Sequence, residues 1–503
     1  MTSGGNAFDA AVAVATTIAV VEPATNGVGG DAFYVLFEAA ERRATVVQSC
    51  APAAAAATLD RYRDGIPHHG PFAAMPPGAP AGWSYIAERY ASKPTPELFA
   101  AAIHYAREGF AATRTYCRDV TPLHSQLAHD PGCREIYVPS GELPKPGTTI
   151  KNPALARTLE ALAGGGAGAL FGGEIGQQLA LFMREHRGLI SIDDLRAHCV
   201  KLPEPLRVPY RGLEVLQAPP PSMGFALLVE LGIAEHFELG SLEHASAEAV
   251  HLLVEAKKLA YLEREQWAGD PERVRPPLAE LLSPAHLAKL AARVDRTRAQ
   301  PNAGPASRNG DTTYFCVADG DGNAVSGIQS LAGPFGACVL DPATGILLNN
   351  RMVWFHLEPG HPNVLAPRKH VRHTINPPLA LEDGALRCVW GTPGGDAQPQ
   401  VSLQTFTSVF DWGLDPQQAV EAPRWQHFQP GTGSYYPHVD PDMLLLESRF
   451  GPGVSDALRE LGHAVVEAGP LDGPGSAAMI TRDASGLLIC GADPRRDGWA
   501  AAF

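Results

Sequence analysis

The sequence of 503 residues contains no run of 18 or more apolar residues, so nothing in it predicts a membrane-spanning helix. It also lacks clusters of Lys and Arg. Together with the net charge of −14, this argues against a surface that neutralises nucleic-acid phosphates. Serine-rich linkers, low-complexity stretches and charge runs are missing as well. We therefore expect a protein that is folded throughout and whose partner is a small molecule, with no nucleic acid and no membrane involved.

Closely spaced cysteines, a metal motif and a serine-hydrolase motif are also absent. The eight cysteines lie far apart in the sequence, as isolated core thiols usually do: Cys50, Cys117, Cys133, Cys199, Cys316, Cys338, Cys388 and Cys490. Four histidines lie closer together, but their spacing matches no common zinc motif: His356, His361, His370 and His373. No Gly-x-Ser-x-Gly turn is present, which argues against an α/β-hydrolase. The sequence predicts no metal and no cofactor.

Helical patterns prevail from the N-terminus to about Arg293. Polar residues at 3–6 precede the apolar run from Ala7 to Val21, which predicts a buried helix stopped by Pro23. Further helices are expected at 96–109, 152–164, 191–198, from 225 onward and at 247–267. The glycine-rich segment 27–37 follows a helix and opens a strand. A dinucleotide-binding loop requires the opposite order, so we predict none.

Strand patterns prevail after Asn309. Residues 312–330 predict two strands joined by a tight turn at 319–323. More strands are expected at 387–390, 477–481 and 487–490, and one earlier strand from Tyr210 to the three prolines at 219–221. Two sheets packed together and covered by helices would bury this mixture, which is an α+β fold.

Seven segments carry a specific resemblance. They are SGGNAFDAAVA at 3–13, PPPSMG at 219–224, AGDP at 268–271, DTTYFCVADGDGNAVS at 311–326, GILLNNRM at 345–352, GTPGG at 391–395 and GADPRRDG at 491–498. On these motifs nearly the whole chain resembles the gamma-glutamyltranspeptidase family. The resemblance implies a four-layer αββα sandwich of the N-terminal-nucleophile hydrolase type.

The resemblance also implies a precursor that cuts itself between Asp311 and Thr312. A large subunit, 1–311, and a small subunit, 312–503, would then stay associated as one intertwined domain. A dimer of this pair is left open.

Thr312 is the expected nucleophile. A threonine hydroxyl needs a base within hydrogen-bond reach, and cleavage would expose an α-amino group with a reference pKa of about 8 on the same residue. The resemblance assigns supporting hydroxyls to Thr313 and to Ser330, which replaces the usual Thr, and the oxyanion contacts to Gly394 and Gly395. A simpler interpretation takes the Thr-Thr pair as strand propensity and Gly-Gly as a turn, but their register with the surrounding motifs favours catalysis.

The substrate-binding positions depart from the family pattern. The Arg-Glu-x-Ala-Pro stretch that binds an α-carboxylate in the family is Gln48-Ser49-Cys50-Ala51-Pro52 here. Asn349-Asn350 are followed by Arg351 and then Trp354, where the family has groups that hold an α-ammonium, and a cation there would repel it. A Ser-Ser pair is replaced by His373-Thr374, and a nearby Asn by Ala332.

Arg351 is suited to a carboxylate, which its planar fork can bind through two hydrogen bonds. We therefore expect a small acidic amide without a nearby ammonium, hydrolysed with water as acceptor, as in the family's oxamate amidohydrolases and glutaryl-type acylases. The expected substrate-binding residues are Gln48, Asn349, Arg351, His373 and Thr374.

Three alternatives remain. Arg351 could be a structural ion-pair partner, and the enzyme could be a true gamma-glutamyltranspeptidase or glutathione hydrolase. It could also be a non-catalytic scaffold relative, although the presence of Thr312, Asn349, Gly394 and Gly395 argues against that.

The start of the chain bears on localisation. The Ala-rich segment from Ala7 carries Asp9 and lacks a basic leader and a cleavage site, so we expect a cytoplasmic protein. The chain begins inside the family's pattern, however, and a leader missing from it would place the protein in the periplasm.

Overall fold

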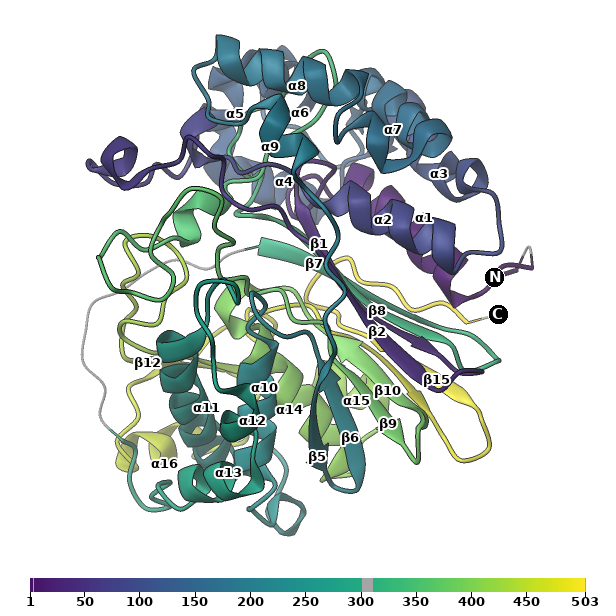
Figure 1. Ribbon diagram of the computed structural model, residues 1–503. Coiled ribbons are helices and arrows are strands. Elements are labelled where there is room, and N and C mark those ends of the chain that lie inside the picture. The colour runs from purple at the N-terminus through teal and green to yellow at the C-terminus, as the bar shows by residue number, and fades with distance from the viewer. Residues whose placement is uncertain (3, 301–310, 503) are drawn as a thin grey trace.

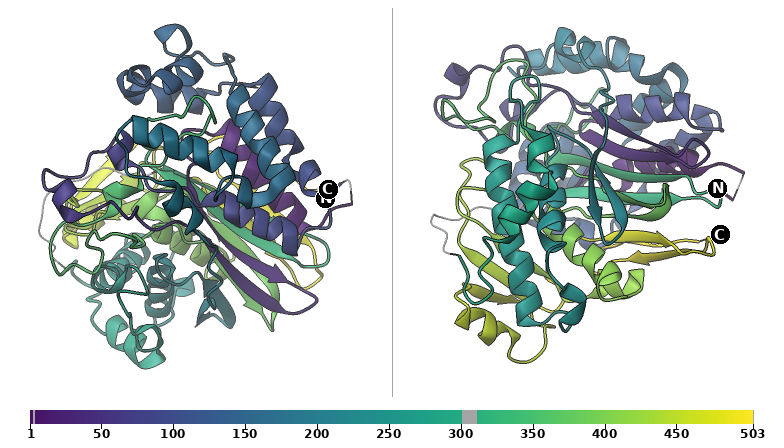
Figure 2. Two further views of the ribbon diagram at one scale, coloured as in Figure 1. Left: turned by 45° about the horizontal axis from the view of Figure 1, so that its top comes forward. Right: turned by 60° about the horizontal axis from the view of Figure 1, so that its bottom comes forward.

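The computed structural model describes residues 1–2, 4–300 and 311–502, with the backbone alone at positions 140 and 311. Two β-sheets lie face to face in this part of the chain, and helices cover their outer faces (Figure 1). The views in Figure 2 show the same arrangement from two other directions. The predicted four-layer αββα sandwich is confirmed.

The first sheet has four antiparallel strands in the order β2-β1-β8-β7. Their bounds are Arg43–Ser49 (β2), Asp31–Glu38 (β1), Ala324–Ala332 (β8) and Asp311–Ala318 (β7). The last two form the hairpin predicted at 312–330. Its turn is closed because the Asn323 backbone N–H donates to Asp319 Oδ1 at 3.0 Å, as the turn-forming residues there suggested.

The second sheet has six antiparallel strands in the order β15-β14-β10-β9-β6-β5. Their bounds are Leu488–Ala492 (β15), Ala478–Arg482 (β14), Ala385–Gly391 (β10), Leu379–Glu382 (β9), Leu213–Gln217 (β6) and Leu206–Tyr210 (β5). The single strand predicted from Tyr210 is wrong at its start. Arg211 and Gly212 adopt φ of 49° and 81°, so the chain turns there and Tyr210 ends β5.

Two groups of helices form the outer layers (Figure 1). On the first sheet lie α1 (Ala7–Val21) and α2 (Ala79–Arg89), with α3 (Thr95–Glu108), α7 (Pro153–Gly165), α4 (Arg114–Val120), α5 (His124–His129), α6 (Pro131–Tyr137), α8 (Glu174–Glu185) and α9 (Ile192–Arg196) further out. On the second sheet lie α10 (Gly224–Ala234), α14 (Gln398–Phe410) and α15 (Pro416–Glu421), with α11 (Ala247–Trp267), α12 (Leu278–Leu281), α13 (Pro284–Ala291) and α16 (Val454–Glu460) further out.

Two smaller sheets complete the fold. They are β3 (Phe110–Ala111) with β4 (Thr149–Ile150), and β11 (Trp425–Phe428), β12 (Met443–Glu447) and β13 (Val465–Ala468). None of the helices in the described ranges combines the length and apolar character needed to cross a bilayer.

Local sequence explains the buried helix α1, whose bounds match the prediction. The Asn6 side chain accepts from the backbone N–H groups of Phe8 and Asp9, and the Asp9 carboxylate accepts from the Asn6 N–H at 2.7 Å. This capping box satisfies the first turn. The Asp9 carboxylate also accepts from Ser92 and Lys93, which accounts for a buried acid in this helix.

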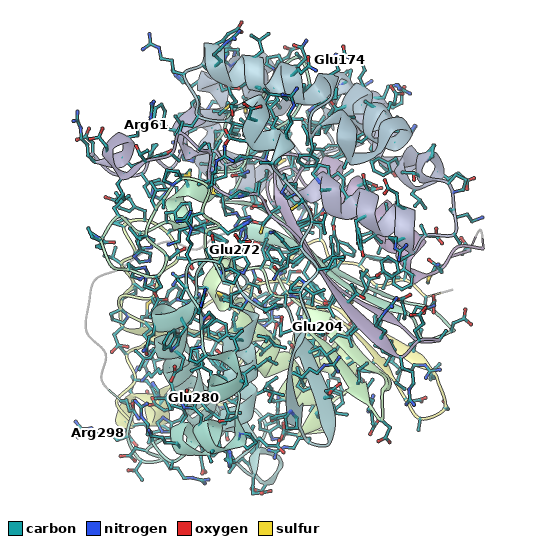
Figure 3. All side chains as sticks on the ribbon, in the orientation of Figure 1. Arg61, Glu174, Glu204, Glu272, Glu280 and Arg298 are labelled. Atoms are coloured by element: carbon teal, nitrogen blue, oxygen red, sulfur yellow. The ribbon has the colours of Figure 1, made fainter. Side chains whose placement is uncertain are left out.

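The core has one apolar layer at each of the three interfaces of the sandwich. The central layer, between the sheets, includes Phe33, Val35, Ile328, Leu379 and Val389, each fully buried. Many charged side chains lie on the outer surface, for example Arg61, Glu174 and Glu280 (Figure 3). Both sheets combine strands from before and after the 311–312 bond. A cut at that bond would therefore leave two parts joined by strand pairing and a shared core.

Candidate active site

The starts or ends of all four strands of the first sheet lie side by side at one end of the sheet. In the antiparallel register, β1 begins and β2 ends there, with Ala32 opposite Ser49, and β8 ends there, with Ser330 opposite Asp31. The start of β7 lies at the same end, since Asp311 pairs with Ala332. Gln48 of β2 therefore lies at the same end of the sheet as Thr312 and Ser330 of the hairpin β7–β8, although it is more than 260 residues away in the sequence.

Strand ends of the second sheet lie opposite this end of the first sheet. β6 ends at Gln217, β9 begins at Leu379 and β10 ends at Gly391. Gly391 packs so closely on the ring of Tyr314 that a Cβ at this glycine would collide with it. The end of β10 thus lies over the start of β7, and the loops that leave this end of the second sheet carry the predicted residues His373, Thr374, Gly394 and Gly395.

Thr312 contacts Ser330. Thr312 is 1% exposed and Ser330 is fully buried, and the Thr312 hydroxyl donates to Ser330 Oγ at 3.3 Å. The pairing of β7 with β8 shifts between Asp311 and Thr313, an irregularity that falls on Thr312. The chain is unbroken here, so this is the arrangement before any cleavage. The geometry is compatible with the predicted supporting role of Ser330.

Thr313 faces a different set of groups. Its hydroxyl donates to Glu22 Oε2 at 2.7 Å, accepts from Asn26 Nδ2 at 3.0 Å and contacts the Thr25 hydroxyl. These partners lie in the segment that follows α1. The side-chain oxygen of Asn26, Oδ1, in turn accepts from Gln329 Nε2 at 2.7 Å. Sequence reasoning missed these partners, and their only signal was a polar stretch between an apolar helix and a strand.

Arg351 is fully buried in a short helical turn, Arg351–Trp354. Its Nε donates to Asp31 Oδ2 at 3.2 Å and its Nη2 donates to the Ser330 carbonyl oxygen at 3.1 Å. The guanidinium carbon lies 4.0 Å from the ring centre of Trp354. Among the described residues, Nη1 has no hydrogen-bond partner. Arg351 is thus an ion-pair partner of Asp31, held against the residue that contacts the Thr312 hydroxyl.

The two charges of this pair perturb each other. Burial raises the pKa of Asp31 to about 6, although the neighbouring Arg351 acts in the opposite direction. Burial also lowers the pKa of Arg351, and Asp31 opposes that shift. The Asp31 carboxyl therefore changes its charge in an ordinary range of working pH.

Next to Arg351 lies a group of buried polar atoms. The His373 ring centre is 5.9 Å from that of Trp354 and 5.2 Å from that of Phe33. Both ring nitrogens of His373, Trp354 Nε1 and Thr374 Oγ1 make no hydrogen bond to the described residues. Burial, then Arg351, holds the pKa of His373 well below its ordinary value, so the imidazole is neutral. Unsatisfied buried polar groups are costly, and a polar ligand would satisfy them.

Asn349 and Gln48 are held by backbone groups. Asn349 Oδ1 accepts from the N–H groups of Met75 and Arg351 at 3.1 and 3.0 Å, and Nδ2 donates to the carbonyls of Gly29 and Met75 at 2.8 and 2.9 Å. This fills the hydrogen-bonding capacity of the amide. The Asn349 side chain is thus held by backbone groups, one of which is the N–H of Arg351. Gln48 Nε2 donates to the Pro219 carbonyl at 2.6 Å.

The four clustered histidines lie in three different places. The rings of His356 and His361 stack at 3.5 Å, His370 Nδ1 lies 3.7 Å from Cys50 Sγ, and His373 lies beside Trp354. Possible metal ligands do gather at Glu265, His356 and His361. Arg264 and Arg372 both bind that glutamate, however, and their charges oppose a cation. Lys258 does the same to Glu255 in a second group, with His251 and His463.

Gly394 and Gly395 form the turn between β10 and α14. Their φ angles are 124° and 56°, a region that side chains rarely adopt. Gly394 also packs against the backbone of Gly475. The turn thus requires glycine, and its backbone can come close to a substrate.

The αββα sandwich places the protein in the class of N-terminal-nucleophile hydrolases. The chain belongs to the gamma-glutamyltranspeptidase family, whose model matches residues 1–503. The oxamate amidohydrolase proenzyme of Klebsiella pneumoniae is 36% identical over 510 residues, covering 99% of this chain and 94% of the relative. The glutathione hydrolase-like YwrD proenzyme of Bacillus subtilis is 35% identical over 504 residues, covering 99% and 94%.

Among solved structures, the cephalosporin acylase from Bacillus halodurans superposes with a TM-score of 0.90 at 29% identity, covering 100% of this chain and 92% of that one. Family membership makes the protein an amide-hydrolysing enzyme of the autocatalytically processed, zymogen-forming kind.

Proposed function

We propose that the chain cuts itself before Thr312 and then hydrolyses a small acidic amide through an acyl-enzyme on Thr312, with water as acceptor. The observation that carries this proposal is the chain of contacts Thr312–Ser330–Arg351. It joins the nucleophile to a buried guanidinium with an unused nitrogen. Two of the relatives support amide hydrolysis, being named an oxamate amidohydrolase and a cephalosporin acylase.

Self-cleavage needs only groups of this chain and water. The Thr312 hydroxyl attacks the main-chain carbonyl carbon of Asp311, its proton passes to the nitrogen of Thr312, and the peptide C–N bond breaks, so that this nitrogen leaves as an amine. Water then hydrolyses the resulting ester, which releases the main-chain carboxylate of Asp311 and restores the hydroxyl. The new α-amino group is the base that the nucleophile requires.

Substrate hydrolysis repeats this chemistry. The α-amino group takes the proton of the Thr312 hydroxyl as Oγ attacks the amide carbon, and the N–H groups of Gly394 and Gly395 stabilise the oxyanion. The proton passes to the leaving amine as the C–N bond breaks. Water then attacks the ester, and the acid leaves.

The acid group of the substrate is assigned to Arg351 Nη1. A carboxylate there would accept from a guanidinium that is already oriented by Asp31 and stacked on Trp354. The neutral His373 ring and the Thr374 hydroxyl offer further polar contacts. A substrate with an α-ammonium would bring a like charge to Arg351, which disfavours gamma-glutamyl compounds.

A panel of amides tests this proposal. We expect oxamate or a glutaryl amide to be hydrolysed with a kcat/KM at least ~10-fold above that of a gamma-glutamyl anilide or an uncharged amide of equal length, since one charge-assisted contact contributes about 1.5–3 kcal/mol. Initial rates of amine release give the comparison. Efficient transfer of the gamma-glutamyl group of glutathione to a dipeptide would refute the acidic-amide assignment while leaving Thr312 as the nucleophile.

Binding of the acid should depend on pH through Asp31. Above pH 6 the Asp31 carboxylate neutralises Arg351, whereas below pH 6 it is protonated and the guanidinium charge is free to attract a substrate carboxylate. We expect the Kd of glutarate, measured by calorimetry, to fall by about 3–10-fold between pH 7.5 and pH 5.5. Asp31→Asn should bind glutarate tightly at both pH values. An unchanged pH dependence in that variant would remove Asp31 as the cause.

A further inference from the structure

Asp396 directly follows the Gly394–Gly395 turn, and its side chain is tied to the helical layer behind it. Arg264 Nη1 donates to Asp396 Oδ1 at 2.6 Å, and Arg264 is fully buried in α11. The Ser434 hydroxyl donates to the same oxygen at 2.6 Å, and the Ser434 backbone N–H donates to Oδ2 at 2.8 Å. Both carboxylate oxygens are therefore engaged, by one cation and two neutral donors.

The backbone of Asp396 is held as well. The Tyr261 hydroxyl, also from α11, donates to the Asp396 carbonyl oxygen, and Gln400 Nε2 donates to the same oxygen at 3.2 Å. The guanidinium of Arg264 lies 4.1 Å from the ring centre of Tyr261 and also bonds the Thr432 carbonyl. Burial pushes the pKa of Asp396 upward, but Arg264 and Ser434 outweigh it and keep that pKa below its ordinary value. The carboxylate thus stays charged in its buried setting.

We call the contacts of Asp396 with Arg264, Ser434 and Tyr261 the Asp396 clamp. They adjoin a turn that has little rigidity of its own. Glycine populates both signs of φ, so Gly394 and Gly395 hold φ of 124° and 56° only because their surroundings fix them. Oxyanion donors are effective when they are aimed before the reaction starts. The residue after the turn is anchored at three points, which sets the direction of the two glycine N–H groups.

We propose that Asp396 and Arg264 are positioning residues, whose buried ion pair fixes the Gly394–Gly395 turn for oxyanion binding. This inference rests on the proposed function, in which those glycines serve the oxyanion. The pair touches no substrate atom. It acts through the backbone of the turn, and it stabilises only those states in which the substrate carbonyl oxygen carries a negative charge.

Asp396→Asn tests the pair with little change of shape. The amide has one acceptor oxygen, so it must turn its NH₂ group toward either Arg264 or Ser434, which are both donors. We expect kcat for the preferred acidic amide to fall by about 10–100-fold, which does not exceed the loss caused by removing one oxyanion donor. KM should stay within about 3-fold of the wild-type value. Tyr261→Phe removes one of the two donors to the Asp396 carbonyl oxygen and leaves Gln400 in place, so it should lower kcat by a smaller factor.

Asp411→Asn is the matched control. Asp411 is also a buried acid that accepts from an arginine, Arg211 at 2.8 Å, and from a tyrosine, Tyr210 at 2.6 Å. It follows the opposite end of α14, about 20 Å away at 1.5 Å per residue. Its replacement removes the same charge from the same layer, and we expect kcat to change by less than about 3-fold.

Binding of a boronic acid separates positioning from general loosening. A short carboxyalkyl boronic acid forms a tetrahedral adduct with the Thr312 hydroxyl, whereas glutarate binds as a planar acid. Asp396→Asn should weaken the boronate by the same factor as kcat and leave glutarate unchanged. Equal weakening of both ligands, or equal loss of kcat in Asp396→Asn and Asp411→Asn, would overturn the positioning role.

Thr312→Ala in the same assay distinguishes the two proposals. If Thr312→Ala is inactive and Asp396→Asn keeps the wild-type kcat, the clamp inference fails and the proposed nucleophile stands. If Thr312→Ala keeps full activity, the proposed function fails, and the clamp inference fails with it. Should Asp396→Asn not fold, Tyr261→Phe carries the test: wild-type kcat and boronate affinity in that variant would refute the inference.

Discussion

Thr312→Ala is expected to remain one uncut chain and to lose amide hydrolysis by roughly 10⁴-fold or more, as removal of a covalent nucleophile does. The methyl side chain can neither attack the Asp311 carbonyl nor form the acyl-enzyme. The loss should leave the fold intact, because the substitution removes one hydroxyl and one methyl group and leaves the pairing of β7 with β8 unchanged. Intact-mass analysis of purified protein reports the cleavage directly.

Thr312→Ser is the matched variant, since it keeps the hydroxyl and removes one methyl group. It should yield two fragments, the smaller beginning with Ser at position 312, and should retain measurable hydrolysis. Sequencing of the new N-terminus distinguishes cleavage at 311–312 from nicking elsewhere. Wild-type protein that stays uncut yet hydrolyses amides would exclude the self-cleavage and the N-terminal base together.

Elements with strong local signals could be predicted from the sequence. The Asn6 cap and Pro23 bracket α1, and the turn residues 319–323 join β7 to β8, so both were predicted close to their bounds. Among the strands that were missed, β2 has seven residues, whereas β9 and β11 have only four each. Such strands carry too few alternations to be recognised, and their pairing partners, not their own residues, define them.

The site was predictable where motifs are contiguous. Thr312, Ser330 and the glycine turn were located by segments of the family pattern, whereas their supports come from remote positions. Asp31 and Arg351 are 320 residues apart, and Arg264 and Asp396 are 132 apart. A sequence shows that an acid and a base exist, but pairing across such separations is decided by the sheet register and by helix packing. Glu22, Thr25 and Asn26 were missed for the same reason.

Under the proposed function, the preference for an acidic over an uncharged amide depends on the positive charge of Arg351. Arg351→Gln alone would leave the Asp31 carboxylate buried and unpaired, which typically costs about 3–5 kcal/mol of stability. The double variant Asp31→Asn/Arg351→Gln removes both charges and keeps neutral hydrogen-bonding groups in place. We expect it to fold and to cleave itself before Thr312, because neither side chain takes part in that chemistry.

For the acidic amide, kcat/KM of this double variant should fall by about 100-fold, since loss of a buried charge-assisted contact costs about 3 kcal/mol and 1.4 kcal/mol corresponds to a factor of ten. For the uncharged amide it should change by less than about 3-fold, because that substrate offers no carboxylate to Arg351. Asp31→Asn alone is the control. It leaves Arg351 buried without its partner and so lowers stability as well, but the folded enzyme should keep or improve the rate with the acid, since the guanidinium charge is then uncompensated. Equal losses for both amides would mean that the pair only supports Ser330 through its carbonyl oxygen, and the carboxylate would then have to bind elsewhere in the site.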